Sequence, residues 1–454
     1  MKTLLLAFAF LGLVPAFTKA AEPERDFIAH EWKLSIKGTN APLFDRSGSD
    51  FVVHEWGTFT SVQGGDGVQM IWNPLVAPDL PRFVYDRTRS QGKARIRGIV
   101  VAGKTGSAQR QRMETPVIYF YSDRTRTVDV AVRFPGGSIT EWYPQESALE
   151  PNGLFEFNPS LPVLHWRNIQ VLPRFACSVP LLTEQAPSHY YAARETDSSE
   201  LAQWEGGKVE FEKFLFYRGL ASAEAPLTVK LDAANSRQII LTNTGADELP
   251  QLFVYEIRPG GGAWLDVKHL QPGETRRASL EATAGAHAIT AADLSLGKAM
   301  IASSPRLNTS LLDALTNAGL YPREARAMIR TWEDSWFGEP GLRVLYTLPR
   351  SWTERTLPLT IAPAPTTIER VMIARAEVIT PAMEQGLLEQ VERYVAATPE
   401  ERTEVVAETR KLGLGRFTGS TLQRLLQNGK LGSEFNTRSW ELVRAATAAT
   451  SDAQ

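Results

Sequence analysis

The chain has 454 residues, of which 43% are hydrophobic and 22% are charged, and its formal net charge is −2 at pH 7. These values fit a globular protein of about three domains, and they exclude a largely disordered chain, which would be less hydrophobic and more unevenly charged. The balanced charge argues against nucleic acid or another polyanion as a partner of the whole molecule, and the single cysteine, Cys177, excludes an intrachain disulfide.

The first 20 residues have the three parts of a secretory signal peptide. Lys2 supplies the basic start, and an apolar run extends from Leu4 to Phe17. Thr18 and Ala20 then suit cleavage after Ala20. The run is too short to span a bilayer comfortably, and no later segment approaches the roughly 20 apolar residues of a membrane helix. We therefore expect residues 1–20 to be removed and the soluble mature chain to be exported, to the periplasm or out of the cell, without a membrane span.

Residues 21–204 are predicted to form an N-terminal β-rich domain. Apolar stretches such as TPVIYFYS (115–122) and TVDVAVRF (127–134) are separated by Gly and Pro, which is typical of an antiparallel sandwich or barrel. Residues 205–304 also alternate between apolar and polar positions, with turns at NTG (243–245) and PGE (272–274). This second segment resembles an immunoglobulin-like sandwich, although it lacks the Cys-Trp-Cys pattern.

Residues 305–454 change in character. Two helices are predicted over 307–320 and 321–337, the second with Pro322 in its first turn. Strands return briefly, and the rest is helical, with a capping box expected from Thr398 to Glu401. The predicted fold class is therefore mainly β with a helical C-terminal region (α+β): two antiparallel β-sandwich-like domains followed by a mixed, mostly helical segment.

The stretch FVVHEWGTF (51–59) reads as a strand that carries a histidine beside a glutamate. His54-Glu55 starts like the zinc-binding pattern HExxH, but position 58 is threonine, and Gly57 with its β-branched neighbours disfavours the helix that this pattern needs. In a strand His54 and Trp56 share one face and Glu55 lies on the other. Neither face is purely polar, so both are expected to be covered. A covered Glu55 must be paired in the structure or functional.

A metal site assembled from separate strands is one hypothesis. His54, His165 and His189, with or without Glu55, would suit one divalent transition metal, either zinc, copper or iron. The alternative is that each histidine is hydrogen-bonded within the core or at the surface.

Glutamates beside aromatic residues suggest a second hypothesis. Glu55, Glu114 and Glu141 could supply the paired carboxylates of a glycoside hydrolase, with Trp56 as a stacking surface for a sugar. The alternative is that the aromatic residues belong to the core of a sandwich.

The segment from Arg82 to Arg112 is locally basic and could hold an anionic small molecule or a glycan, or simply be a solvated face. Tyr190 and Arg194 would meet if their segment were helical. They would then orient an anionic ligand, or tie a loop to Glu195 or Asp197. The phosphate-loop pattern over 98–105 is rejected because Ile-Val-Val-Ala within it favours a strand, so no nucleotide is expected.

Several of these stretches together resemble a known kind of protein. HEWGTFT, METPVIYFYS, SHYYAARE, EKFLFYRG and TWEDSWFGEPGLRVLY look like segments of a widespread family of exported bacterial proteins without an assigned function. The resemblance covers most of the mature chain. It implies a bacterial, exported setting, and it supplies neither an activity nor catalytic residues.

Two main classes of function follow. The first is an exported enzyme of hydrolytic type, in which His54, His165 and His189 bind a metal that activates water and Glu55 or Glu114 is a ligand or general base. Arg194 and the basic segment would position an anionic substrate. The second is a non-catalytic envelope protein that binds glycan or protein through exposed aromatic residues. A glycosidase with paired glutamates is a further alternative. The substrate and the oligomeric state stay open.

Overall fold

The computed structural model describes residues 51–72, 80–86, 111–150, 162–174, 178–221, 223–290, 305–432 and 435–448. All of them belong to one compact unit, Gly38–Gln454. The fold is mainly β, with 41% strand and 28% helix, and helices dominate the C-terminal region, which confirms the predicted fold class at this level. The predicted signal peptide, Cys177 and most of the basic segment lie outside the described residues.

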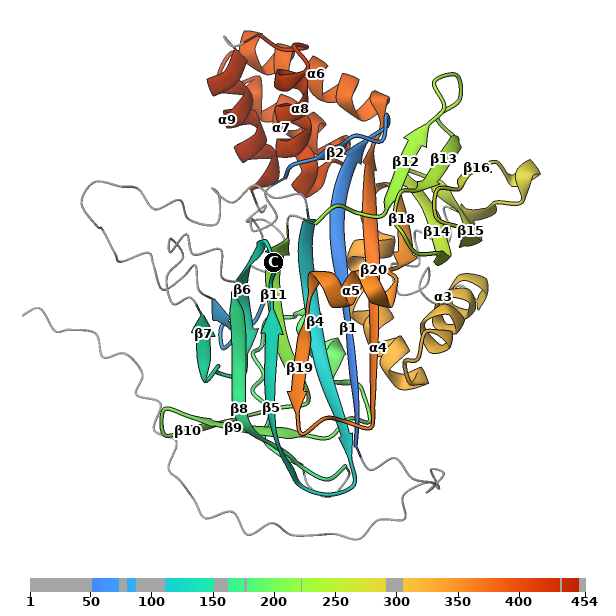
Figure 1. Cartoon of the computed structure of the whole chain (residues 1–454). Helices are drawn as coiled ribbons and strands as arrows, with labels where there is room; N and C mark the ends of the chain where they lie inside the picture. The colour runs from blue at the N-terminus through green and yellow to red at the C-terminus, as the bar shows by residue number, and fades with distance from the viewer. Residues whose placement is uncertain are drawn as a thin grey trace, which may run out of the picture. The chain divides into compact units, whose positions relative to one another are not determined.

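The largest sheet has 11 strands within the described ranges (Figure 1). In spatial order these are β17 (His287–Thr290), β15 (Gly261–Leu270), β14 (Leu249–Arg258), β18 (Gly341–Thr347), β20 (Thr367–Ile379), β1 (Phe51–Gly64), β4 (Gln111–Ser122), β11 (Leu215–Ala221), β6 (Gly137–Tyr143) and β3 (Tyr85–Asp86), with β2 (Gln69–Met70) beside β1. The long central strands β1 and β20 run parallel, and the other described pairs are antiparallel.

This sheet takes strands from all three segments that the sequence analysis separates. β1 and β4 come from 21–204, β11 and β14 from 205–304, and β18 and β20 from 305–454. Division of the chain at 204 and 304 would therefore separate strands that are hydrogen-bonded to one another in one sheet. Local periodicity identifies a strand but does not contain its pairing partner, which is fixed by contacts between residues far apart in the sequence.

Two smaller sheets pack on one face of the large sheet. The six-stranded sheet contains β10 (Lys208–Glu212), β9 (Leu201–Glu205), β8 (Val163–Val171), β5 (Arg126–Arg133) and β19 (Leu359–Ala362), with β7 (Ala148–Glu150) beside β8. The three-stranded sheet contains β12 (Leu227–Leu231), β13 (Gln238–Asn243) and β16 (Thr275–Ser279). Val53 of β1, Val130 of β5, Trp166 of β8 and Leu241 of β13 share one buried core, which the short helix α5 (Arg350–Thr356) joins through Trp352.

Helices cover the opposite face of the large sheet. They are the 3-10 helix η3 (His189–Arg194), α3 (Pro305–Asn317), α4 (Pro322–Glu333) and the π-helical turn η5 (Asp334–Gly338). Trp56 of β1 packs here in one cluster with Tyr190, Trp332 and Trp336. Pro322 lies in the first turn of α4, as the sequence predicts. Because both faces of the sheet are covered, all 14 residues of β1 are buried.

The C-terminal helices form a third core. They are α6 (Pro381–Ala396), α7 (Arg402–Lys411), η6 (Gly415–Phe417), α8 (Thr418–Gln427) and α9 (Asn436–Thr447), and a further 3-10 turn, η4 (Ala282–Ala284), lies before β17. Leu387, Leu422 and Leu442 pack with Val62 and Ile379, so this core adjoins the ends of β1 and β20 (Figure 1).

The capping box predicted from Thr398 to Glu401 is present just before α7. The Thr398 N–H donates to Glu401 Oε2 at 2.9 Å, and the Glu401 N–H donates to Thr398 Oγ1 at 3.4 Å. Among the helices that the structure describes, none is both long and apolar enough to cross a membrane.

Candidate functional site

β1 sends its adjacent residues His54 and Glu55 into different surroundings. The alternation of a strand places His54 with Trp56 on the helix-covered face and Glu55 with Phe59 on the face that packs against the smaller sheets. The side chains of His54 and Glu55 are 2% and 0% exposed. One short motif therefore contributes to two separate buried polar sites.

His54 is paired with a carboxylate from α4. Its Nδ1 atom lies 2.6 Å from Glu324 Oε2, and the two residues are 270 positions apart in the sequence. Glu324 is fully buried, and the same Oε2 accepts a hydrogen bond from the Tyr321 backbone N–H at 3.0 Å. The backbone at the start of α4 thus fixes the position of Glu324, and Glu324 in turn orients the imidazole.

Two tyrosine rings enclose this imidazole–carboxylate pair. The centroids of Tyr121 and Tyr321 lie 5.2 Å and 4.5 Å from that of His54. Burial and then the charge of Glu324 raise the pKa of both phenols. They therefore stay protonated at neutral pH and can donate hydrogen bonds. The Tyr321 side chain is 37% exposed, so it forms the solvent side of the site.

The arrangement suits proton transfer. A carboxylate at Nδ1 accepts the proton of that nitrogen, which fixes the tautomer and leaves the lone pair on Nε2. Among the described residues, the Nε2 atom of His54 has no hydrogen-bond partner. The same logic orients the base of nucleophilic and hydrolytic enzymes, where the carboxylate also stabilises the imidazolium that forms.

The other two predicted metal ligands lie elsewhere. His165 is on β8 in the six-stranded sheet, and His189 begins η3, where its ring packs 5.4 Å from Trp332. Within the described ranges, no group of three or more His, Cys, Asp or Glu side chains could hold a metal ion. The metal site stays a prediction that the geometry of these residues does not support.

Glu55 forms an ion pair within the core, which is the structural one of the two roles predicted for it. Its Oε2 lies 2.5 Å from Arg370 Nε, and its Oε1 accepts a hydrogen bond from the Tyr217 hydroxyl. Burial and the Glu55 charge raise the pKa of Tyr217, so this donor stays protonated. Trp56 is fully buried beside Tyr119, with ring centroids 5.8 Å apart, and its ring faces the core.

The remaining predicted carboxylates also have partners. Glu114 on β4 accepts hydrogen bonds from Thr60 Oγ1 at 2.9 Å and Arg416 Nη1 at 2.6 Å. Thr60 shares the face of His54, so Glu114 and Glu55 lie on opposite faces of the sheet and cannot flank one glycosidic bond. Glu141 is buried on β6, opposite Arg218 of β11.

Tyr190 and Arg194 come together as predicted, but around a resident carboxylate. Glu212, which is fully buried, accepts hydrogen bonds from Tyr190 OH at 3.0 Å and Arg194 Nη2 at 2.6 Å. Burial would lower the pKa of Arg194, but Glu212 outweighs it and the pKa is raised. The alternative partners considered from the sequence are engaged by α4 instead: Glu195 by Arg330 and Asp197 by Arg323.

A cluster of buried arginines and glutamates was not foreseen from the sequence. Arg343 on β18 and Arg375 on β20 are both fully buried and contact Glu377. Both guanidinium groups also donate to the Ser335 carbonyl, which belongs to the π-helical turn η5. The signal was available: each arginine interrupts an otherwise apolar strand, in LRVLY and IARAEVI, where a charge needs a buried partner.

Comparisons with known proteins do not identify a family. No family model and no curated protein matches the chain. Among solved structures, the yeast delta-COP-I mu-homology domain is similar with a TM-score of 0.27 and 7% identity, over 72% of this chain and 97% of that one. The same domain with a Dsl1 WxWxV peptide gives a TM-score of 0.25 and 7% identity, over 72% and 98%. Similarity at this level does not define a function.

Proposed function

We propose that the chain is an exported enzyme of hydrolytic type, in which His54 is the general base and Glu324 orients it. The contact between His54 Nδ1 and Glu324 Oε2, at 2.6 Å inside the core, carries this proposal. In this role Nε2 takes a proton from water as the water oxygen bonds to the electrophilic atom of the substrate, and Glu324 stabilises the resulting imidazolium. The imidazolium then returns the proton to the leaving group as the scissile bond breaks.

The surroundings of the pair suit a substrate that is or becomes negatively charged. The Arg174 guanidinium lies over the Tyr121 ring, 5.7 Å from its centroid, and adds a positive charge beside the site. Tyr121 stays protonated and is within the electrostatic reach of Glu324. The partly exposed Tyr321 ring packs against the imidazole with a tilt of 40° between the ring planes, so it covers His54 on the solvent side.

A chemical labelling experiment tests whether His54 can act as a base without knowledge of the substrate. Diethyl pyrocarbonate acylates accessible, unprotonated imidazole nitrogens, and mass spectrometry locates the modified histidines. We expect His54 to be modified in the folded protein, and Glu324→Gln to slow its modification. His269 is the matched control, because its Nδ1 also lies 2.6 Å from a carboxylate, that of Glu248, but its side chain is 71% exposed.

The outcomes distinguish a general base at His54 from a purely structural histidine. If His54 stays unmodified while His269 reacts fully, solvent does not reach Nε2 and the proposal fails. The pair would then serve only to dock α4 onto β1.

The alternative of a non-catalytic binding protein has one observation in its favour. Trp204 on β9 is 63% exposed, in a hairpin with β10, which is an edge strand of the six-stranded sheet as described. Exposed tryptophan is enriched where proteins bind partners. Failure of the labelling test would make this hairpin the first surface to examine.

A further inference from the structure

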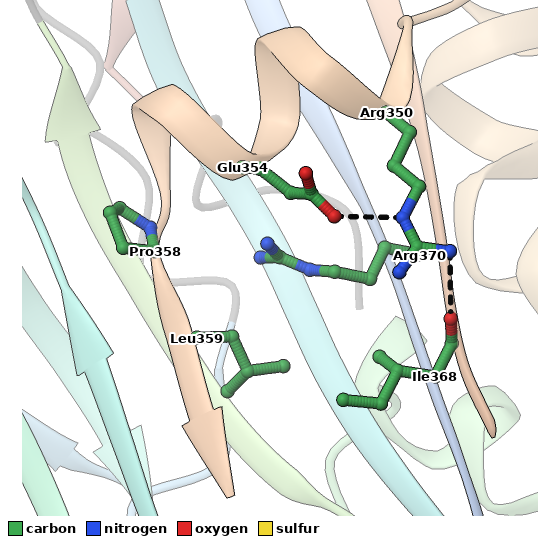
Figure 2. A pocket seen from close by; sticks show the side chains of 6 residues that line it. All are labelled: Arg350, Glu354, Pro358, Leu359, Ile368 and Arg370. Carbon is green, nitrogen blue, oxygen red and sulfur yellow. Dashed lines mark hydrogen bonds and ion pairs between the residues drawn. The ribbon is translucent and has the colours of Figure 1, made fainter. Parts of the chain in front are cut away.

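A cavity of about 210 Å³ lies on the opposite face of β1 from His54. It is lined by Arg350 and Glu354 of α5, Pro358 and Leu359 at the start of β19, and Ile368 and Arg370 of β20. Figure 2 shows the Arg370 side chain extending between Glu354 on one side and Leu359 and Ile368 on the other. The cavity thus combines a buried cation with an apolar wall.

The Arg370 guanidinium is fixed by hydrogen bonds through two of its three nitrogens. Its side chain is 3% exposed, Nε binds Glu55 Oε2, and Nη2 donates to the Leu357 carbonyl at 2.7 Å. The Tyr217 hydroxyl, which donates to Glu55, also lies within hydrogen-bonding reach of the guanidinium. Within the residues that the structure describes, Nη1 donates to no backbone or carboxylate acceptor. A guanidinium fixed through Nε and Nη2 is preorganised to donate to one more acceptor through Nη1.

A second guanidinium stands at the rim. Arg350 donates from Nε to Glu354 Oε1 at 2.8 Å and from Nη1 to the Ile368 carbonyl at 3.0 Å, and its side chain is 52% exposed (Figure 2). Glu369 lies 3.9 Å from the same Nη1. The two arginines are therefore balanced by carboxylates around them, which disfavours a doubly charged ligand.

We propose that this cavity binds a small monocarboxylic acid with a short apolar body. The carboxylate accepts from Nη1 of Arg370 and from Arg350, because hydrogen bonds between a guanidinium and a carboxylate are charge-assisted and strong. The apolar body lies on Pro358, Leu359 and Ile368. Typical drug-sized pockets are roughly 300–1,000 Å³, so a cavity of about 210 Å³ suits a smaller molecule. This ligand site is independent of the proposed chemistry at His54.

Ligand-detected NMR with simple acids tests the assignment. The probes are butyrate, benzoate, the neutral analogue butyramide and inorganic phosphate. We expect at least one of the two acids to bind with a Kd on the order of 1 mM, and butyramide and phosphate to bind at least roughly tenfold more weakly, since each lacks one half of the recognised chemistry.

Variants locate the binding. Arg350→Gln should weaken it by about tenfold, the effect of one charge-assisted hydrogen bond. Leu359→Trp should abolish it by filling the cavity. Arg355→Gln is the matched control: it removes the same charge from the same helix, its side chain is 62% exposed, and it does not line the cavity. Its Kd should stay within about twofold of the original.

Four results would overturn the proposal: no binding of either acid up to roughly 10 mM, equal binding of butyramide, tighter binding of phosphate, or equal effects of Arg350→Gln and Arg355→Gln. Arg350 is half-exposed at the rim, so its variant keeps the test decisive even where Leu359→Trp fails to fold. Arg370 itself is left unchanged in these variants, because its removal would leave the buried Glu55 carboxylate without its cation.

Discussion

At the scale of single residues, burial alone does not decide which side chains can react. Glu55 accepts from Arg370 and Tyr217, so its charge is fully engaged in holding three strands of the sheet together. His54, its neighbour, has one nitrogen fixed by Glu324 and the other without a partner among the described residues. The first arrangement stabilises the fold, and the second leaves an atom that can exchange a proton.

The Glu55–Arg370 pair makes a prediction about stability. Arg370→Met leaves the Glu55 carboxylate buried without its cation, which should lower the free energy of unfolding by about 3–5 kcal/mol. The double variant Glu55→Gln, Arg370→Met removes both charges and should recover most of that loss. Denaturant unfolding at neutral pH measures both. A loss below about 1 kcal/mol in the single variant, or no recovery in the double variant, would contradict this account.

Glu339 makes a prediction about pH. Burial would raise its pKa, but Arg375 at 2.5 Å, with Arg416 and Arg343, outweighs burial and lowers the pKa below its ordinary value of 4.5. A carboxyl group whose pKa is lower in the folded state stabilises the fold above its unfolded pKa. That contribution is lost as the pH falls through the folded value.

Glu339→Gln should therefore be less stable than the unmodified protein at about pH 7, and the difference should shrink as the pH falls below about 4.5. Thermal unfolding across this range gives the comparison, with the exposed Glu400→Gln as the charge-matched control. A difference between the two proteins that is independent of pH would show that Glu339 acts through packing rather than charge.

At the scale of the element, β1 pairs differently with its two neighbouring strands. It pairs with β20 without interruption, but its pairing with β4 shifts between Trp56 and Thr58. Gly57 sits at this shift, and a Cβ atom there would lie 2.8 Å from Pro116 Cα. The close approach of β4 at the bulge therefore requires glycine.

Gly57→Ala should cost about 1–3 kcal/mol of stability, the usual effect of overpacking against backbone. Gly419→Ala in α8 is the control, because its nearest heavy atom would be an ordinary 3.4 Å away. It should be neutral or stabilising by up to about 1 kcal/mol, since alanine favours a helix over glycine. Equal unfolding midpoints for the two variants would show that the bulge can relax around a methyl group.

Elements of this kind were largely predictable from the sequence because their signals are local. Local signals, from neighbours within a few residues, specify Pro322 at the first turn of α4, the reciprocal bonds of Thr398 and Glu401, and the covered strand predicted over 51–59, which the structure extends to Gly64. The partners of those elements were not predictable in the same way. Glu324 lies 270 residues from His54, and Arg370 lies 315 residues from Glu55. Nothing in a local pattern specifies which distant charge will neutralise a buried one.

At the scale of the whole molecule, the same limit explains the predicted domain boundaries. β1 near one end of the described chain pairs along its length with β20, more than 300 residues later, so no cut between them leaves a complete sheet. The C-terminal helices differ, because α6–α9 have a core of their own that meets the sheet at Val62 and Ile379. Polar contacts also join this helical block to the sheet: Arg416 to Glu114, and Arg424 to Asp66.

The contact between Arg416 and Glu114 makes a prediction about how the helical block opens. Arg416→Met keeps an apolar side chain over Trp72 and Phe417 but removes the cation from the buried Glu114. Arg416 is 23% exposed, so solvent screens part of the loss, and about 1–3 kcal/mol is expected.

Arg416 lies in η6, immediately before α8. Loss of its contact with Glu114 should therefore appear first as faster amide hydrogen exchange in α6–α9, while β1 and β20 keep their protection. Lys411→Met is the control: it breaks an exposed pair within α7 and should change stability by no more than about 0.5 kcal/mol. Faster exchange spread evenly over β1, β20 and the helices would mean that the block and the sheet unfold as one cooperative unit, and that Glu114 is a support of the entire fold.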